Sequence, residues 1–345
     1  THAPEVIEAA SRAALKFGTG SSGSRLTTGG TFIASELEKR LADFKHSESA
    51  LVFNTGYMTN LGVLYGLMQT GDVVFSDELN HASIIDGCRI SRCKVVVYKH
   101  NDMADLQRLL ETEIVTGQRF IVTDGVFSMD GDIADLPSLA VLKKQFNACL
   151  IVDDAHGVGV IGNDGSGTAS HYGLTDVIDL QVGTLSKALA AEGGYVAGKK
   201  ILIDYLINRS RPFIFSTALA PATLAAANAA LLLLQTQASK YLDSLRANSR
   251  LMRRLLLEGG LNVVEGITPI IPVVIGEAGL TMQFADRLKS KGILVSGIRP
   301  PTVPRGESRL RITVTAAHCE EQLRQAAQII TALWQELKHG EKKEG

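Results

Sequence analysis

Residues 35–200 alternate between short apolar runs and segments with helical periodicity, and this alternation is the strongest constraint on the fold. Strands are expected at 50–53, 73–76, 94–98, 120–123, 150–152 and 178–182, with helices between them at 35–46, 56–68, 81–90, 102–111 and 136–146. Apolar strands that alternate with amphipathic helices form a parallel sheet covered by helices on both faces. The pattern therefore predicts an α/β domain.

The pattern changes after residue 200, where longer helices and a few separate strands follow. Helices are expected at 221–237, 240–258 and 320–338, and strands at 270–275, 293–295 and 310–314. A chain of 345 residues is long enough for two domains. We expect a large domain over residues 1–235 and a smaller α+β domain over residues 236–345.

Charge and composition exclude several classes of function. Thirty-five basic and 36 acidic residues give a net charge of −1, which argues against nucleic acid or an anionic membrane as the main partner. The most apolar stretch, 218–234, is too short and too interrupted for a membrane span. The four cysteines form no metal-ligand spacing, so we expect no metal site and a reducing, cytoplasmic setting. The glycine-rich stretch 18–25 lacks the ending of a nucleotide-binding P-loop and favours a flexible loop.

Asp153 and Lys187 form the strongest chemical signal. Asp153 ends the apolar run 150–152, and Lys187 follows another apolar segment. Ligands of parallel α/β sheets bind beyond the carboxyl ends of the strands. A carboxylate there needs a positive partner, such as a protonated pyridine nitrogen, and a dehydrated lysine can form a Schiff base. The two residues therefore suit pyridoxal phosphate. Each of these residues, taken singly, has a simpler interpretation. Asp153 would be a loop cap, Lys187 a solvated side chain and His156 a structural residue.

Segments upstream supply candidates for contacts with a phosphate and a ring. Gly56 and Tyr57 open a helix directly after a strand, where N–H groups and the helix dipole favour a phosphate. His81 opens another helix and could lie over a planar ring, although helix capping by His81 or Asn80 explains the position equally well. Ser128 follows a strand end and could donate to a cofactor oxygen or close a turn.

Seven segments, in order along the chain, resemble the α-oxoamine synthases, which are pyridoxal-phosphate enzymes of the aspartate-aminotransferase fold type: 23–26, 54–57, 80–83, 127–131, 153–157, 184–187 and 215–217. The resemblance implies a large domain with a mostly parallel seven-stranded sheet and a smaller C-terminal α+β domain. It also implies pyridoxal 5'-phosphate as cofactor and a homodimer. Segments 297–304 and 308–311 resemble the branch that makes 8-amino-7-oxononanoate for biotin from L-alanine and a pimeloyl thioester of coenzyme A or an acyl-carrier protein.

The resemblance assigns a role to each matching residue. Lys187 is expected to bind the cofactor aldehyde and move the α-proton, and Asp153 to keep the pyridine nitrogen protonated. His156 and Ser128 are expected to contact the ring oxygen of the cofactor, and His81 the face of the ring. The expected contacts with the phosphate are Gly56, Tyr57 and Thr184 and, from the neighbouring subunit, Ser216 and Thr217. The expected substrate contacts are Arg311 with the amino-acid carboxylate, Thr302 with the acyl chain, and His81 and Arg25.

Three features depart from the family pattern. The N-terminal segment is expected to be truncated, Ala34 stands where relatives often carry His, and Ala190 stands where they usually carry Gly. Two alternatives therefore stay open. One is a sister enzyme such as glycine C-acetyltransferase, and the other is a catalytically silent partner subunit. Lys187 in its full motif weighs against the silent subunit.

Overall fold

The computed structural model describes residues 1–344, with side chains up to residue 338. It consists of two compact units. The first comprises residues Thr1–Phe127 and Ile133–Ala238, and the second comprises Ser128–Asp132 and Ser239–Gly345. The short segment Ser128–Asp132 thus belongs to the second unit, although its sequence neighbours on both sides belong to the first.

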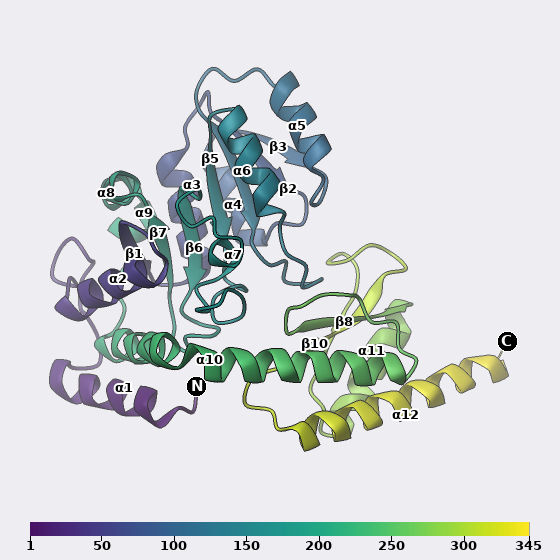
Figure 1. Ribbon diagram of the computed structural model, residues 1–345. Coiled ribbons are helices and arrows are strands. Elements are labelled where there is room, and N and C mark those ends of the chain that lie inside the picture. Colours follow the sequence, from purple (N-terminus) through teal and green to yellow (C-terminus); the bar gives the residue numbers. More distant parts are fainter. Residues whose placement is uncertain (345) are drawn as a thin grey trace. The chain divides into compact units, whose positions relative to one another are not determined.

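A seven-stranded sheet forms the centre of the first unit (Figure 1). Its strands are β1 (Ser49–Phe53), β2 (Val73–Asp77), β3 (Lys94–Tyr98), β4 (Arg119–Asp124), β5 (Ala148–Asp153), β6 (Leu180–Thr184) and β7 (Gly194–Gly198). They lie in the order β1-β7-β6-β5-β4-β2-β3. Strands β6, β5, β4, β2 and β3 pair in parallel, and only β7 runs antiparallel to its two neighbours.

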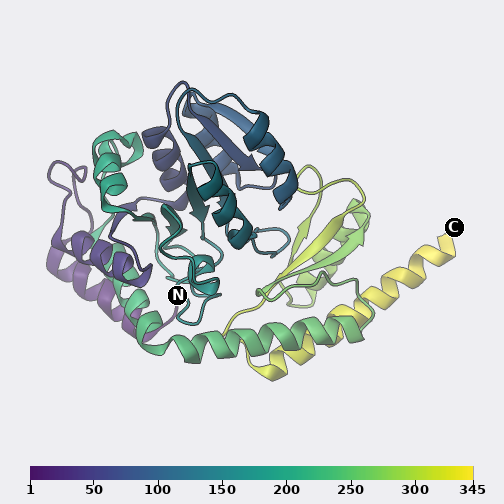
Figure 2. The same ribbon diagram turned by 45° about the horizontal axis from the view of Figure 1, so that its top comes forward.

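Helices cover both faces of this sheet (Figures 1 and 2). They are α1 (Pro4–Phe17), α2 (Phe32–Phe44), α3 (Gly56–Leu67), α4 (Ala82–Ile90), α5 (Met103–Thr112), α6 (Leu136–Gln145), α7 (Thr168–His171), α8 (Lys200–Arg209), α9 (Arg211–Ile214) and the first half of α10 (Pro221–Glu258). Strand β4 shows how the faces are divided. Phe120 and Val122 pack with α3, α4 and α8, while Ile121 packs with α5 and α6, as the alternation of side chains along a strand requires.

The second unit is built on a three-stranded antiparallel sheet of order β8-β10-β9. Its strands are β8 (Ile270–Gly276), β9 (Ser296–Ile298) and β10 (Ser308–Thr313), and its helices are α11 (Ala278–Ser290), α12 (Glu320–Glu344) and the second half of α10. Phe284 stacks on Trp334 at 5.7 Å between the ring centroids. This contact joins α11 to α12 in the core.

The predicted α/β fold is confirmed, and particular elements differ. The two helices expected at 221–237 and 240–258 form α10, which is interrupted at Gln237 by a non-helical backbone conformation. The strand expected at 293–295 is wrong, because β9 lies at Ser296–Ile298. No pattern predicted α1 or β7. Within the described part of the chain, no helix combines the length and the apolar stretch that a membrane span needs.

Candidate active site

The candidate residues of the first unit lie at the carboxyl ends of the sheet strands. Gly56 follows β1, His81 follows β2, Asp153 ends β5, and Thr184 ends β6 with Lys187 three residues later. Strands β5 and β6 are neighbours, with Asp153 paired to Val182. The topology therefore brings chemistry-bearing residues from distant parts of the sequence to one edge of the sheet, as parallel α/β sheets do.

The start of α3 is a candidate phosphate cradle. The side chain of Thr55 caps the helix by accepting the N–H of Met58 at 3.0 Å. The preceding N–H groups, those of Gly56 and Tyr57, have no acceptor inside the helix and are directed out of its start. A Cβ on Gly194 would lie 2.6 Å from the Gly56 nitrogen, and a Cβ on Gly56 would lie 3.3 Å from the Thr184 Cβ. Gly56 and Thr184 are therefore close neighbours at the start of a helix, where N–H groups favour an anion.

The Tyr57 side chain does not extend this cradle. Its ring is exposed, and its hydroxyl donates to the Asp86 carboxylate at 2.5 Å. This hydrogen bond is the main cause of the raised pKa of Tyr57. The contribution of Tyr57 to a phosphate site is therefore limited to its backbone N–H.

A hydrogen-bonded chain connects Asp153 to His81. The Asn60 amide nitrogen donates to Asp153 Oδ2 at 2.6 Å and to Ser83 Oγ at 2.8 Å. Ser83 Oγ in turn lies 2.7 Å from His81 Nδ1. His81 also caps α4 by accepting the Ser83 N–H, so the capping interpretation holds together with any role in stacking. Asn80 does not cap the helix, because its amide bonds Ser76 and Val122 instead.

Asp124 lies beside Asp153 at the end of β4, the two being paired in register. Its Oδ2 accepts the backbone N–H of His81 at 3.0 Å. Burial first, and the Asp153 charge second, raise the pKa of Asp124 well above its usual range, while the His81 N–H and the Lys187 charge oppose that rise. Lys187 thus acts electrostatically on the Asp124 carboxyl group. A second positive charge, such as a pyridinium, would relieve the remaining repulsion.

Lys187 lies on a tight turn between β6 and β7. Two backbone hydrogen bonds close this turn, from Ala190 N to the Lys187 oxygen at 3.1 Å and from Ala191 N to the Leu185 oxygen at 2.9 Å. Ala190 adopts a φ of 53°, in the left-handed region that favours glycine. The methyl group of Ala190 therefore strains the turn that carries Lys187.

Ala190→Gly is expected to raise the free energy of unfolding by about 1 kcal/mol, because glycine adopts this conformation without the steric cost. Urea denaturation monitored by circular dichroism measures the change. Ala191→Gly is the matched control, since Ala191 has no positive φ and should gain nothing. Equal or lower stability of Ala190→Gly would contradict the assignment of strain.

Asp154, to which the sequence assigned no role, forms a buried ion pair. It contacts Lys45 Nζ at 2.9 Å, with both side chains at most 1% exposed, and it accepts the Thr168 N–H and hydroxyl. This pair anchors the loop that follows β5. His156 lies in the first turn of that loop, closed by Gly157 N to the Asp154 oxygen at 2.9 Å. His156 therefore lies in a turn that starts at a residue of this buried pair.

Arg25 has a structural partner in this chain. Its two terminal nitrogens contact the two Glu38 carboxylate oxygens at 2.8 and 2.9 Å, and its guanidinium lies over the Phe213 ring. Glu38 also accepts the Val52 N–H at 3.0 Å. Both prongs of the guanidinium are therefore engaged with Glu38, and substrate binding by Arg25 stays a prediction.

The glycine-rich stretch 18–25 forms a loop, as expected, and contacts with residues 217 and 218 hold its end. Ser24 forms a β-bridge with Thr217, and Ala218 N donates to the Gly23 oxygen at 2.9 Å. The Asn54 amide donates to the Thr217 oxygen at 2.8 Å. These contacts fix the main chain around Thr217, whose side chain remains exposed beside the half-buried Ser216.

Arg311, Arg309 and Ser128 meet in the second unit. Arg311 donates from Nε to the Ser128 carbonyl oxygen and from Nη1 to Thr313 Oγ1. Burial lowers the pKa of Arg311. Arg309 is not a solvated cation, because it is 4% exposed and pairs with Asp130 and Glu307. Arg309 thus holds the segment Ser128–Asp132 through Asp130, and the binding of a substrate carboxylate by Arg311 stays a prediction.

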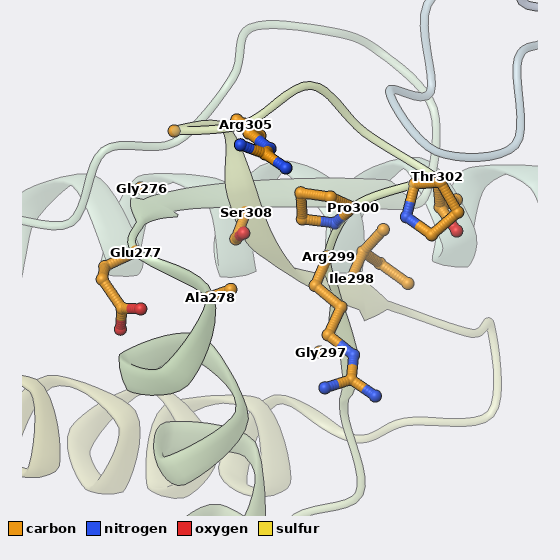
Figure 3. Close-up of a pocket in the computed structure, with 12 residues that line it drawn as sticks. Gly276, Glu277, Ala278, Gly297, Ile298, Arg299, Pro300, Thr302, Arg305 and Ser308 are labelled. Atoms are coloured by element: carbon orange, nitrogen blue, oxygen red, sulfur yellow. The ribbon is translucent and has the colours of Figure 1, made fainter.

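Thr302 lines an open hollow of about 980 Å³ in the second unit (Figure 3). The hollow lies between the end of β8, the start of α11 and the loop from β9 to β10, and Arg299 and Arg305 also line it. Glu277 is the one acidic residue of its lining, and its carboxylate caps α11 by accepting N–H groups of that helix. The two exposed arginines give the hollow a basic rim.

Sequence reasoning missed three residues of this site: Asn60, Ser83 and Asp124. Asp124 ends an apolar strand just as Asp153 does, so the same signal could have identified it. Asn60 and Ser83 lie on largely apolar helices, and only the packing of α3 on α4 reveals their contacts.

The residues present fit pyridoxal phosphate. Gly56 and Thr184 lie close together, at the start of a helix that favours a phosphate. Asp153 ends β5 with a carboxyl group that suits a cationic ring nitrogen, and Lys187 follows the end of the neighbouring strand β6. Among the predicted contacts, the structure brings Gly56 and Thr184 together, and it joins Asp153 to His81 through Asn60 and Ser83.

Comparisons with known proteins agree with this site. The family model for aminotransferase class I and II matches residues 2–330. An 8-amino-7-oxononanoate synthase of Lysinibacillus sphaericus is 52% identical over 308 residues, which cover 89% of this chain and 79% of the relative. The enzyme of the same name from Trichlorobacter lovleyi is 50% identical over 335 residues, which cover 97% of this chain and 86% of the relative.

Solved structures give the same assignment. A serine palmitoyltransferase of Sphingomonas wittichii has a TM-score of 0.95 at 31% identity, covering 98% of this chain and 85% of that one. An 8-amino-7-oxononanoate synthase of Francisella tularensis has a TM-score of 0.81 at 30% identity, covering 98% and 95%. The chain therefore belongs to the class I and II aminotransferase family and, within it, to the α-oxoamine synthases.

Proposed function

We propose that this protein is a pyridoxal-phosphate-dependent acyltransferase that condenses L-alanine with a pimeloyl thioester, releases carbon dioxide and forms 8-amino-7-oxononanoate for biotin. The observation that carries the proposal is the convergence of Asp153, Lys187 and the α3 cradle on one sheet edge, in a chain that is half identical to relatives with that name.

Pyridoxal phosphate, when bound, supplies an aldehyde for the amino group of the substrate and a protonated ring that accepts electrons from the α-carbon. The chain's own residues make this chemistry possible. Asp153 holds a proton at the ring nitrogen through its carboxylate, which Asn60 orients. The Lys187 amine removes the α-proton and returns a proton to the product.

Orientation of the substrates is assigned to the remaining residues. His81 would lie against the ring of the bound cofactor, and His156 and Ser128 would donate to the ring oxygen. Gly56, Tyr57 and Thr184 bind the phosphate through N–H groups and a hydroxyl. Arg311 binds the alanine carboxylate with its planar fork. Thr302 and the basic rim of its hollow face the thioester substrate.

The test of the reaction is a direct assay of its products. With pyridoxal phosphate, L-alanine and pimeloyl-coenzyme A, the protein should release free thiol and a product with the mass of 8-amino-7-oxononanoate in equal amounts. Thiol release without the amino ketone would indicate thioester hydrolysis and would overturn the proposed reaction.

The protein is expected to act as a homodimer, because Ser216 and Thr217 lie on the surface of a single chain while the resemblance places them at a neighbour's phosphate. Phe215 beside them is 68% exposed. Sedimentation equilibrium of the loaded protein should give at least twice the monomer mass of 36.9 kDa. A monomer with full cofactor occupancy would contradict this assembly.

Arg305→Ala is expected to raise KM for a coenzyme A thioester roughly two- to fivefold, in line with an exposed charge contact of about 1 kcal/mol or less. KM for a pimeloyl thioester of N-acetylcysteamine, which lacks phosphates, should not change. Added salt should reduce the difference between variant and parent. Arg254→Ala, an exposed arginine on α10, is the control, and an equal effect on both thioesters would refute the basic rim.

Glycine C-acetyltransferase is the second candidate, since it shares the same core by resemblance. The relatives near 50% identity favour the first proposal. The silent-subunit alternative is disfavoured because Lys187 is present with its neighbours in place. Four free cysteines support the proposal of a reducing, cytoplasmic location.

A further inference from the structure

The hydrogen bonds between Asp153 and His81 can run in only one direction. Asn60 is 3% exposed and Asp153 is 6% exposed, so the contact of 2.6 Å between them is shielded from water. If the Asn60 amide were reversed, its carbonyl oxygen would face a carboxylate, which offers only acceptors. The nitrogen must therefore face Asp153, and its second hydrogen points to Ser83 Oγ at 2.8 Å.

The direction of the hydrogen bonds continues from Ser83 to His81. Its hydroxyl oxygen accepts from Asn60, so its single hydrogen is available for His81 Nδ1 at 2.7 Å. The backbone N–H of Ser83 points to the same nitrogen at 3.3 Å. With two donors directed at it, Nδ1 of His81 is an acceptor, and the ring proton belongs on Nε2.

The position of the His81 ring is fixed as well. Its backbone N–H donates to Asp124 Oδ2 at 3.0 Å, and the Asp124 N–H donates to Asn80 Oδ1 at 2.8 Å. The strand ends β2 and β4 are thereby tied together directly before the ring. Ser83 is 1% exposed, whereas His81 itself is exposed, so the hydrogen bond partner of the ring is buried while the residue remains accessible to a ligand.

We propose that Asn60 and Ser83 are positioning residues that couple Asp153 to His81 and hold His81 as the tautomer with its proton on Nε2. This inference deepens the proposed function, because it concerns the two residues assigned to the nitrogen and the face of the cofactor ring. These hydrogen bonds form without the cofactor, so the donors and acceptors of the site are already oriented before the cofactor binds.

The test reads the tautomer without any turnover. Protein labelled with ¹⁵N-histidine, free of cofactor and held at about pH 8.5 to keep imidazoles neutral, is examined by ¹H–¹⁵N correlation spectra, with His81 assigned through His81→Gln. The parent should show the Nε2–H form. Ser83→Ala should show a mixture of tautomers, and Ser83→Thr, which keeps a hydroxyl, should restore the parent spectrum. Ser244→Ala, an exposed serine on α10, is the control.

A second measurement examines the Asp153 end of the hydrogen-bonded chain. Asn60→Ala should weaken the binding of pyridoxal phosphate roughly tenfold, as expected for loss of a hydrogen bond to a charged group, and should shift the pH midpoint of the bound cofactor's visible absorption. Ser83→Ala should leave that midpoint closer to the parent value, because it keeps the Asn60–Asp153 contact. Asn208→Ala, on exposed α8, should change neither quantity.

Particular results overturn the inference. The Nδ1–H form in the parent would refute the direction of the chain, and an unchanged tautomer in both Ser83→Ala and Asn60→Ala would refute the coupling. Should the parent fail to make the amino ketone, the tautomer result still stands or falls by itself, because it is measured on cofactor-free protein.

Discussion

Lys187→Ala protein should lose at least about 10³-fold in kcat/KM for alanine and a pimeloyl thioester. Proton transfer by a positioned group alone contributes about 10²–10⁴-fold, and this variant also loses the amine that holds the cofactor covalently. The loss should arise from the chemistry and not from folding, because Lys187 is exposed on its turn while the bonds that close the turn are made by the backbone.

Borohydride reduction followed by peptide mapping measures the covalent link. The parent should carry the reduced cofactor on the peptide that contains Lys187, and Lys187→Ala should carry none. Lys200→Ala, an exposed lysine paired with Asp204, should behave as the parent does. A reducible link elsewhere on the chain of Lys187→Ala would remove Lys187 from its assigned role.

Arg311→Ala should still bind pyridoxal phosphate but should bind alanine at least roughly tenfold more weakly. Arg311 is half-buried, and Nη2 makes no hydrogen bond within the described residues, while Nε and Nη1 hold the side chain against Ser128 and Thr313. A guanidinium fixed in this way is preorganised for a carboxylate. Loss of such a pair costs about 2–5 kcal/mol, and about 1.4 kcal/mol already gives a factor of ten.

Spectral titration of the bound cofactor with alanine measures this affinity, and two further variants separate charge from geometry. Arg311→Lys keeps the charge without the fork and should bind alanine with intermediate affinity. Arg309→Ala should lower thermal stability more than alanine affinity, because Arg309 is buried in ion pairs with Asp130 and Glu307. Unchanged alanine affinity in Arg311→Ala would leave the carboxylate without its assigned partner.

The sequence predicted those parts of the fold and site that depend on local patterns. Asp153 was found because an apolar strand ends in a carboxylate, and Gly56 because a helix begins directly after a strand. The antiparallel strand β7 was not found, since Gly194–Gly198 is short and glycine-rich. Its direction depends on pairing with both β1 and β6, which are far apart in the sequence.

Contacts between segments that are far apart in the sequence could not be predicted from local patterns. Asn60 and Ser83 become partners only when α3 packs on α4. Ser128 was predicted as a cofactor contact from its place after β4, yet its segment packs with β10 through Arg309 and Arg311. The alternating pattern of the strand could not reveal that Arg309 is buried. Its partner Asp130 is 179 residues away in the sequence.

The most direct test of the central claim is a matrix of turnover rates. Alanine, glycine and serine are each assayed with pimeloyl, acetyl and palmitoyl thioesters of coenzyme A, using the same loaded preparation and identifying each product by mass. The account predicts the highest kcat/KM for alanine with the pimeloyl thioester. A maximum for glycine with the acetyl thioester, or for serine with the palmitoyl thioester, would contradict the proposed reaction, while absence of turnover in every pair would favour the silent subunit.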